Sequence, residues 1–213
     1  MNKFFNANNP VMNFLTNLYN IMLLNWLFLL CSLPFFTIGA SFSAMYNVAF
    51  KIIKDEDPSV IKDFFTSFKS NFRQSTILWI PLFLLTLFFA VDLFIVYHVL
   101  GQDLQFFQYP IWILITVILS IIIYAFPLIA RYESSTKEII RNSILLSIAN
   151  FPTTIFILAI QYAIGYIAAG SAKSLVMTGS LFLFFACAGL ACFYSLFFNR
   201  IFDKCDEKKD LDN

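Results

Sequence analysis

The chain has 213 residues, of which 60% are hydrophobic and 13% are charged, and its net charge at pH 7 is +1. Soluble domains are about half apolar and about a quarter charged, so this composition excludes an ordinary water-soluble domain and favours a membrane protein. The near-zero net charge also excludes the strongly basic surface of a nucleic-acid-binding protein.

Five apolar segments predict membrane-spanning helices, because a hydrocarbon core of about 30 Å takes about 20 helical residues. They cover residues 14–33, 75–99, 108–130, 151–169 and 174–198. Their apolar runs are continuous, which does not fit the alternating strands of a membrane β-barrel. We therefore expect an all-α, polytopic transmembrane bundle that forms a single domain over residues 1–200, followed by a short, polar, disordered tail over 201–213.

The first apolar stretch is interrupted at Pro34, which should end its helix. Thr37 then provides a candidate N-cap for a second helix that reaches charge at Lys51. This helix is short for a full span, and we expect it to return to the side on which the chain starts. A single kinked helix with an external N-terminus is the alternative.

Small residues follow this break at the spacing of one helical face. Gly39 lies four residues before Ser43, and Ala40 lies four residues before Ala44. Membrane helices use such pairs to bring their backbones close together. We expect the returning helix to pack tightly against the first one.

Two charged segments between the apolar ones predict amphipathic helices. In residues 57–73, Asp57 is a candidate cap, and apolar side chains recur at helical spacing opposite Lys62, Lys69 and Arg73. The apolar set is Ile61, Phe64, Phe65, Phe68 and Phe72. Such a helix fits either anionic lipid headgroups or the end of the bundle.

The second amphipathic segment covers residues 131–149. Ser135 and Glu138 have the spacing of a capping box, and an apolar face follows before Pro152 opens the next span. Arg131, Lys137 and Arg141 supply its basic charge, and Glu133 with Lys137 has the spacing of a helical ion pair. We expect this segment, like the first, to contact headgroups or the bundle.

The basic residues predict the orientation of the chain. They lie in residues 51–73, 131–149 and the tail, whereas the two remaining connections contain only Lys173. The set is Lys51, Lys54, Lys62, Lys69, Arg73, Arg131, Lys137, Arg141, Arg200, Lys204, Lys208 and Lys209. By the positive-inside rule, these segments and the C-terminus lie in the cytoplasm of a multi-pass cell-membrane protein, and the hairpin reading places the N-terminus there too.

Polar residues within the apolar segments are the candidate functional groups, because they are costly in lipid. Asp92 is the only acidic residue inside a predicted span, and Gln161 lies in the middle of another. Asn25 lies on the first helix and Asn47 on the returning one. These side chains either form hydrogen bonds between helices, for example from Asp92 to Gln161, or line the path of a polar solute.

No pattern typical of a metal, redox or catalytic site occurs in the sequence. Cys31, Cys187 and Cys192 lie in apolar segments and Cys205 in the tail, without metal-ligand spacing. The motifs of zinc hydrolases, serine hydrolases and P-loop proteins are also missing. We expect a protein that is not an enzyme and needs no cofactor.

The first 80 residues and the segment PLIARYES, from Pro127 to Ser134, resemble the YesL-type family of bacterial integral membrane proteins. The matching positions are Asn25, Leu33, Pro34, Thr37, Gly39, Ala40, Ala44, Phe64, Phe68, Lys69, Asn71 and Phe72. The resemblance implies a membrane protein of Gram-positive-type bacteria, often encoded near genes for carbohydrate uptake and sensing. It implies no established activity and no catalytic residues.

Two functional hypotheses follow. The first is an accessory or regulatory component of carbohydrate uptake or sensing, whose cytoplasmic helices contact a transporter or sensor protein. The second is a small-solute transporter or channel that uses Asp92, Gln161 and the helix break at Pro34.

Overall fold

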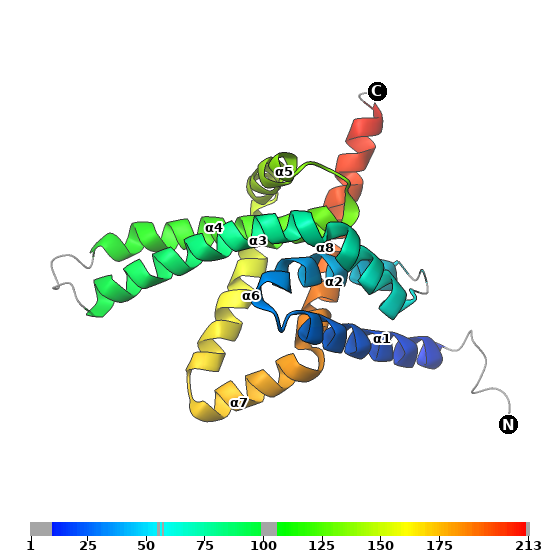
Figure 1. Ribbon diagram of the computed structural model, residues 1–213, viewed down its shortest axis with the longest axis horizontal. Coiled ribbons are helices and arrows are strands. Elements are labelled where there is room, and N and C mark those ends of the chain that lie inside the picture. The colour runs from blue at the N-terminus through cyan, green and yellow to red at the C-terminus, as the bar shows by residue number, and fades with distance from the viewer. Residues whose placement is uncertain (1–9, 55, 57, 99–105, 212–213) are drawn as a thin grey trace.

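The computed structural model describes residues 10–54, 56, 58–98 and 106–211, and all regular structure in these ranges is helical (Figure 1). The α-helices are α1 (Pro10–Cys31), α2 (Ile38–Ile53), α3 (Val60–His98), α4 (Gln108–Arg131), α5 (Thr136–Ala149), α6 (Phe151–Ala169), α7 (Ala172–Leu181) and α8 (Cys187–Leu211). A 3₁₀ turn, η1 (Phe35–Thr37), precedes α2, and a π-helical turn, η3 (Phe182–Ala186), joins α7 to α8. The expected all-α architecture is confirmed.

Six helical segments of the described chain are long and apolar enough to cross a membrane. They are Phe14–Cys31, Phe35–Ile53, Val60–His98, Gln108–Arg131, Phe151–Ala169 and Ala172–Glu207. Five of them contain the predicted spans, and the sixth is the short returning helix. By length and composition, therefore, the returning helix also qualifies as a span.

Helix α2 forms the centre of the bundle, where it packs against α1, α3, α4 and α8. Ala40, Ala44 and Val48 are fully buried on it. Because protein rather than lipid surrounds this helix, it can carry Ser41, Ser43 and Asn47 at lower cost than a lipid-facing span could.

Side-chain hydrogen bonds satisfy backbone carbonyl groups in the turn between α1 and α2. The Thr37 hydroxyl donates to the carbonyl oxygens of Cys31 and Pro34, both at 2.5 Å. Thr37 is the N-cap residue of α2, as predicted, but its side chain accepts no hydrogen bond from that helix. From α3, the Trp79 indole donates to the Phe35 carbonyl at 3.1 Å. The two helices are therefore separate and contact each other, as the hairpin prediction requires.

The small residues of α2 do not pack mainly against α1, as the sequence suggested, but against α3. A Cβ atom on Gly39 would lie 2.7 Å from the Ser75 carbonyl oxygen and 2.7 Å from the Trp79 Cβ. One turn further along, the hydroxyls of Ser43 and Ser75 form a buried hydrogen bond of 3.1 Å. The small residues Gly39 and Ser43 thus allow α2 and α3 to approach closely.

The predicted amphipathic helix over 57–73 and the span over 75–99 are one continuous helix, α3, of 39 residues. No helix breaker separates the two segments, and Pro81 lies inside the helix without ending it. At 1.5 Å per residue α3 is about 58 Å long, so it exceeds a bilayer core. Its first turns pack on the bundle through Phe64, which is fully buried, while Ile61 and Phe65 stay exposed. The Asp57 cap falls outside the described residues.

Helix α5 begins with the predicted capping box. The Ser135 backbone N–H donates to the Glu138 carboxylate at 2.9 Å, and the Glu138 N–H donates to the Ser135 hydroxyl at 3.3 Å. These hydrogen bonds hold the pKa of Glu138 below its usual value. The expected helical pair of Glu133 and Lys137 does not form, because α4 ends at Arg131 and α5 starts only at Thr136.

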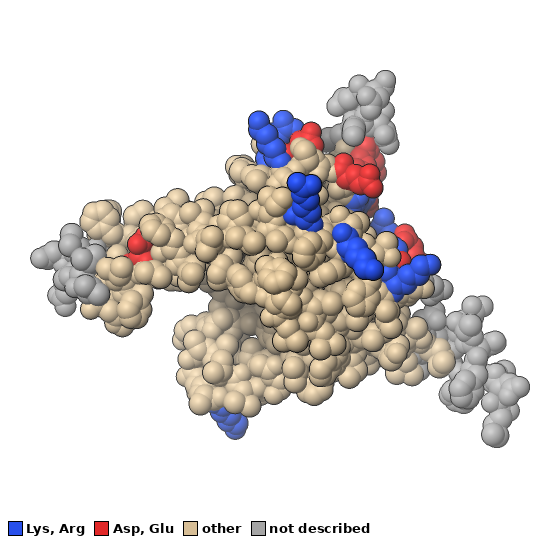
Figure 2. All heavy atoms as spheres, viewed as in Figure 1, with Lys and Arg blue, Asp and Glu red and all other residues tan. Residues whose placement is uncertain are grey.

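The polar tail is helical rather than disordered up to Leu211, where α8 ends. Contacts with the end of α4, described below, hold this last part of α8 against the bundle. Charged side chains gather near the ends of α2, α4 and α8, the start of α3 and on α5, which we call the charged end (Figure 2). Most of the remaining visible surface carries no charge.

Candidate functional site

Asn25, predicted as an intramembrane polar candidate, binds the π-helical turn. Its side-chain amide donates to the carbonyl oxygens of Phe182 at 3.1 Å and Leu183 at 3.0 Å. Its side-chain oxygen accepts the Ala188 N–H at 3.0 Å. A π-turn frees backbone groups from the regular helical ladder, and this fully buried amide satisfies three of them. The side-chain amide of Asn25 thus has a structural role.

Asn47 and Gln161 also form hydrogen bonds between helices. The Asn47 amide donates to the Ala130 carbonyl of α4 at 3.1 Å. The Gln161 amide donates to the Tyr194 hydroxyl of α8 at 3.3 Å. Gln161 therefore meets α8, whereas the sequence suggested Asp92 as its partner.

Asp92 lies half-buried on α3. Among the described residues it takes part in no ion pair. It lines none of five well-formed cavities of the described chain. The structure does not bring Asp92, Gln161 and the break at Pro34 into one site.

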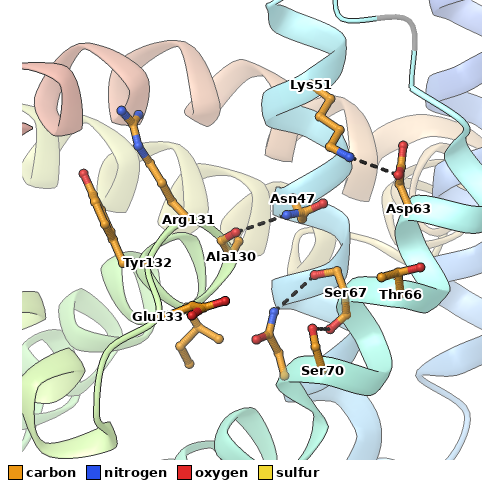
Figure 3. Close-up of a pocket in the computed structure, with 12 residues that line it drawn as sticks. Asn47, Lys51, Asp63, Thr66, Ser67, Ser70, Ala130, Arg131, Tyr132 and Glu133 are labelled. Atoms are coloured by element: carbon orange, nitrogen blue, oxygen red, sulfur yellow. Dashed lines mark hydrogen bonds and ion pairs between the residues drawn. The ribbon is translucent and has the colours of Figure 1, made fainter.

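A polar cavity of about 280 Å³ opens at the charged end (Figure 3). One wall comes from the end of α2 and the start of α3, and the other from the end of α4. Its lining residues are Asn47, Lys51, Asp63, Thr66, Ser67, Ser70, Asn71, Ile129, Ala130, Arg131, Tyr132 and Glu133. A second cavity of about 190 Å³ shares Asn47, Lys51, Ala130 and Arg131 with it. We call the two together the polar groove.

Hydrogen bonds and one ion pair shape the groove. Lys51 Nζ lies 2.9 Å from Asp63 Oδ1, and this pair joins α2 to α3. The Asn71 amide donates to the Ser67 hydroxyl at 3.2 Å on the α3 wall. The groove is lined by three basic side chains (Lys51, Lys54 and Arg131) and three carboxylates (Glu56, Asp63 and Glu133), so it offers hydrogen bonds rather than a strong field of either sign. This arrangement suits a small polar ligand or a polar protein segment.

Arg131 joins the groove to the end of α8. Its guanidinium donates to Asp203 at 2.6 Å and to Asp206 at 2.8 Å, and also to Asn199 at 3.3 Å. The neighbouring Tyr132 hydroxyl donates to Asp206 at 2.9 Å. Burial, together with this hydrogen bond to a carboxylate, raises the pKa of Tyr132.

We expect Arg131→Gln to loosen the end of α8 without unfolding the bundle. Hydrogen bonds to charged groups contribute about 1.5–3 kcal/mol each, less here because both aspartates are partly exposed. A loss of about 1–3 kcal/mol corresponds to a rise in amide hydrogen exchange over residues 199–207 of roughly fivefold to 150-fold. Arg141→Gln, on exposed α5, is the matched control and should change nothing there; equal exchange in both variants would contradict the role of Arg131.

The other basic candidates lie on the surface of the charged end. Lys62, Lys69 and Arg73 are exposed on α3, and Lys137 and Arg141 are exposed on α5. None of these five takes part in an ion pair within the part of the chain that the structure describes. They line neither cavity of the groove.

Comparison with known proteins matches part of the chain to a described family. Residues 21–93 match the family described as "Protein of unknown function, DUF624". Over these residues, the chain is similar to the DUF624 family. The YesL-type resemblance seen in the sequence is thereby confirmed.

The chain is also 30% identical over 148 residues to the uncharacterized protein YteU of Bacillus subtilis (strain 168). This alignment covers 68% of the chain and 65%, just under two thirds, of YteU. No solved structure matches the chain.

The DUF624 segment contains much of the packing described above. It includes most of α1, all of α2 and most of α3. Within it, Asn25 binds the π-turn, Thr37 closes the hairpin turn, and Gly39 allows α2 to approach α3. Phe64, Phe68 and Phe72 form a row of contacting rings along α3. Several of the residues that carry the resemblance therefore have a packing role in the fold.

The two stretches that carry the resemblance also meet at the polar groove. The α2 and α3 wall lies within residues 21–93, and the α4 wall lies within the segment from Pro127 to Ser134. Sequence reasoning missed the grouping of Lys51, Asp63 and Glu133, because these residues are far apart in the chain. The one feature of the sequence that pointed to the groove was the position of Lys51, close to the end of the returning helix.

Proposed function

We propose that this chain is a non-enzymatic protein of the cell membrane that acts as an accessory or regulatory component of carbohydrate uptake or sensing in a Gram-positive-type bacterium. Its charged end faces the cytoplasm, together with both termini. Its polar groove receives a segment of a membrane transporter or sensor protein. The carbohydrate part of this proposal comes from the YesL-type resemblance alone.

One contrast between the interior and the charged end carries the proposal. Inside the bundle, Asn25 and Gln161 are each engaged with backbone or side-chain groups of another helix. At the charged end, by contrast, the groove is open and lined by side chains that can still form hydrogen bonds, such as those of Thr66 and Glu133. The protein thus offers a polar contact surface at its end rather than along its interior.

Site-specific photo-cross-linking in native membranes tests this proposal. A photo-reactive residue at Thr66 or Glu133, one on each wall of the groove, should capture the same protein partner. The matched control is Met177, which is 66% exposed on α7, away from the groove. Lys51→Gln should reduce the capture, whereas Lys62→Gln, outside the groove, should not. If both groove positions gave the same products as Met177, or none, the proposal would be wrong.

A second candidate function, a small-solute carrier, is favoured by one cavity inside the bundle. This cavity of about 180 Å³ is lined by Gln161 and Tyr194 together with apolar side chains of α2, α4 and α6. Purified protein in vesicles, tested with radiolabelled sugars, should show no uptake above that of empty vesicles. Uptake that falls in Gln161→Leu or Asp92→Asn would favour the carrier instead.

A further inference from the structure

Helix α5 lies across the charged end, and its inner face is partly apolar and partly polar. It contacts α4 and α6, and Figure 1 views it nearly along its axis while α4 and α6 run across the picture. Towards the bundle it buries Ile139, Ser143 and Ser147. The Ser143 hydroxyl donates to the Ile139 carbonyl at 2.7 Å, and the Ser147 hydroxyl donates to that of Ile144 at 2.9 Å. The inner face therefore combines two apolar side chains, Ile139 and Leu146, with two serines whose hydroxyls bond to their own helix.

The outer face of α5 is more apolar than the inner one. Ile140 and Ile144 are each 39% exposed, Leu145 is 57% exposed and Ile148 is 68% exposed. Ile140, Ile144 and Ile148 follow one another at spacings of four, and Leu145 precedes Ile148 by three, so these residues share one side of the helix. A helix of a water-soluble surface shows the reverse pattern, with its apolar side turned inwards. An apolar medium or partner must therefore cover this face.

Two basic residues stand on the same outer face. Lys137 and Arg141 are exposed and connect to Ile140 and Ile144 by spacings of three. The acidic residue of α5, Glu138, is held at the helix start by the capping box. In the described chain, neither basic residue belongs to an ion pair. The outer face is therefore positive in its first half and apolar in its second half.

The position of α5 in the chain indicates what covers it. Only Asn150 separates it from α6, a helix long and apolar enough to cross the membrane. The apolar end of α5 must then lie where α6 enters the bilayer. Basic charge beside an exposed apolar face is typical of helices that lie in the interface of anionic membranes.

We propose that α5 lies on the bilayer surface, with Ile144, Leu145 and Ile148 at the acyl boundary and Lys137 and Arg141 on anionic headgroups. The bilayer thus binds one outer side of the charged end and leaves the polar groove free. This inference does not depend on the proposed function, because it concerns a different face and needs no protein partner.

Fluorescence quenching in reconstituted vesicles tests the proposal on the full chain. The four native cysteines are replaced, and a bimane label is attached to a single cysteine introduced by Ile148→Cys. Lys204→Cys, on the exposed end of α8, is the matched control. We expect brominated acyl chains to quench the label at position 148 and aqueous iodide not to reach it. Position 204 should show the opposite behaviour.

The anionic headgroups are tested in the same vesicles. Phosphatidylglycerol should strengthen the quenching by brominated lipid at position 148, and Lys137→Gln with Arg141→Gln should weaken it. Each removed charge should lower the ratio of bound to detached α5 about fivefold. Free access of iodide to position 148 would overturn the proposal. Shielding from iodide without quenching by brominated lipid would also overturn it, because the cover would then be a second copy of the chain.

Discussion

Replacing Gly39 by alanine should destabilise the bundle, although alanine is the better helix former. The added Cβ would lie 2.7 Å from the Ser75 carbonyl oxygen and 2.7 Å from the Trp79 Cβ, so α2 and α3 would have to separate. Overpacking of this kind costs about 1–3 kcal/mol even where helix propensity offsets part of it. Thermal unfolding of the purified protein in detergent should show a lower midpoint temperature.

Gly165→Ala is the matched control for this prediction. Among the described residues, no atom beyond the adjoining residues and the local helix backbone lies within 4 Å of the position where its Cβ would stand on α6. Only helix propensity should then act, and we expect a neutral or slightly raised midpoint. A drop of the same size in both variants would show that the contact between α2 and α3 is not the cause.

Replacing Asn25 by leucine should have the second large effect. The change removes two hydrogen bonds to the carbonyl oxygens of Phe182 and Leu183 and one from the Ala188 N–H. Buried backbone groups left without a partner cost about 1–3 kcal/mol each, and bonds between membrane helices average less than that, so we expect a total loss of about 2–4 kcal/mol. Denaturant or steric-trap unfolding measures this difference.

Asn20→Leu provides the control on the same helix. Asn20 is only half-buried on α1, and it forms no hydrogen bond to the π-turn. Its replacement should change the stability by less than about 0.5 kcal/mol, as surface substitutions usually do. Equal losses in both variants would contradict the role assigned to Asn25.

Local patterns in the sequence predict much of this fold. Proline at position 34 and charge at Lys51 bound the returning helix, and the spacing of Ser135 and Glu138 marks the start of α5. These features act through neighbouring residues, so a single sequence reveals them. The pattern changes from amphipathic to apolar near Arg73, and for this reason the sequence predicted two separate helices there. The surroundings of α3 change at this point, but its helical backbone continues without a break.

The partners of individual side chains depend on tertiary packing and could not be predicted. Asn25 meets a carbonyl 157 residues further along the chain, at a π-turn that no local pattern announces. The spacing of Gly39 and Ser43 indicates a close contact but does not say which helix makes it. The polar groove, likewise, joins Lys51 and Asp63 to the end of α4 only after three helices have packed together.

The central claim is that this bundle lies in the membrane with its charged end in the cytoplasm. Cysteine labelling with an impermeant maleimide on intact cells tests it most directly, in a background without the native cysteines. We predict that Ser171→Cys, between α6 and α7, is labelled from outside, and that Lys204→Cys on α8 is labelled only after the membrane is permeabilised. Labelling of Lys204→Cys in intact cells with protection of Ser171→Cys would contradict the account.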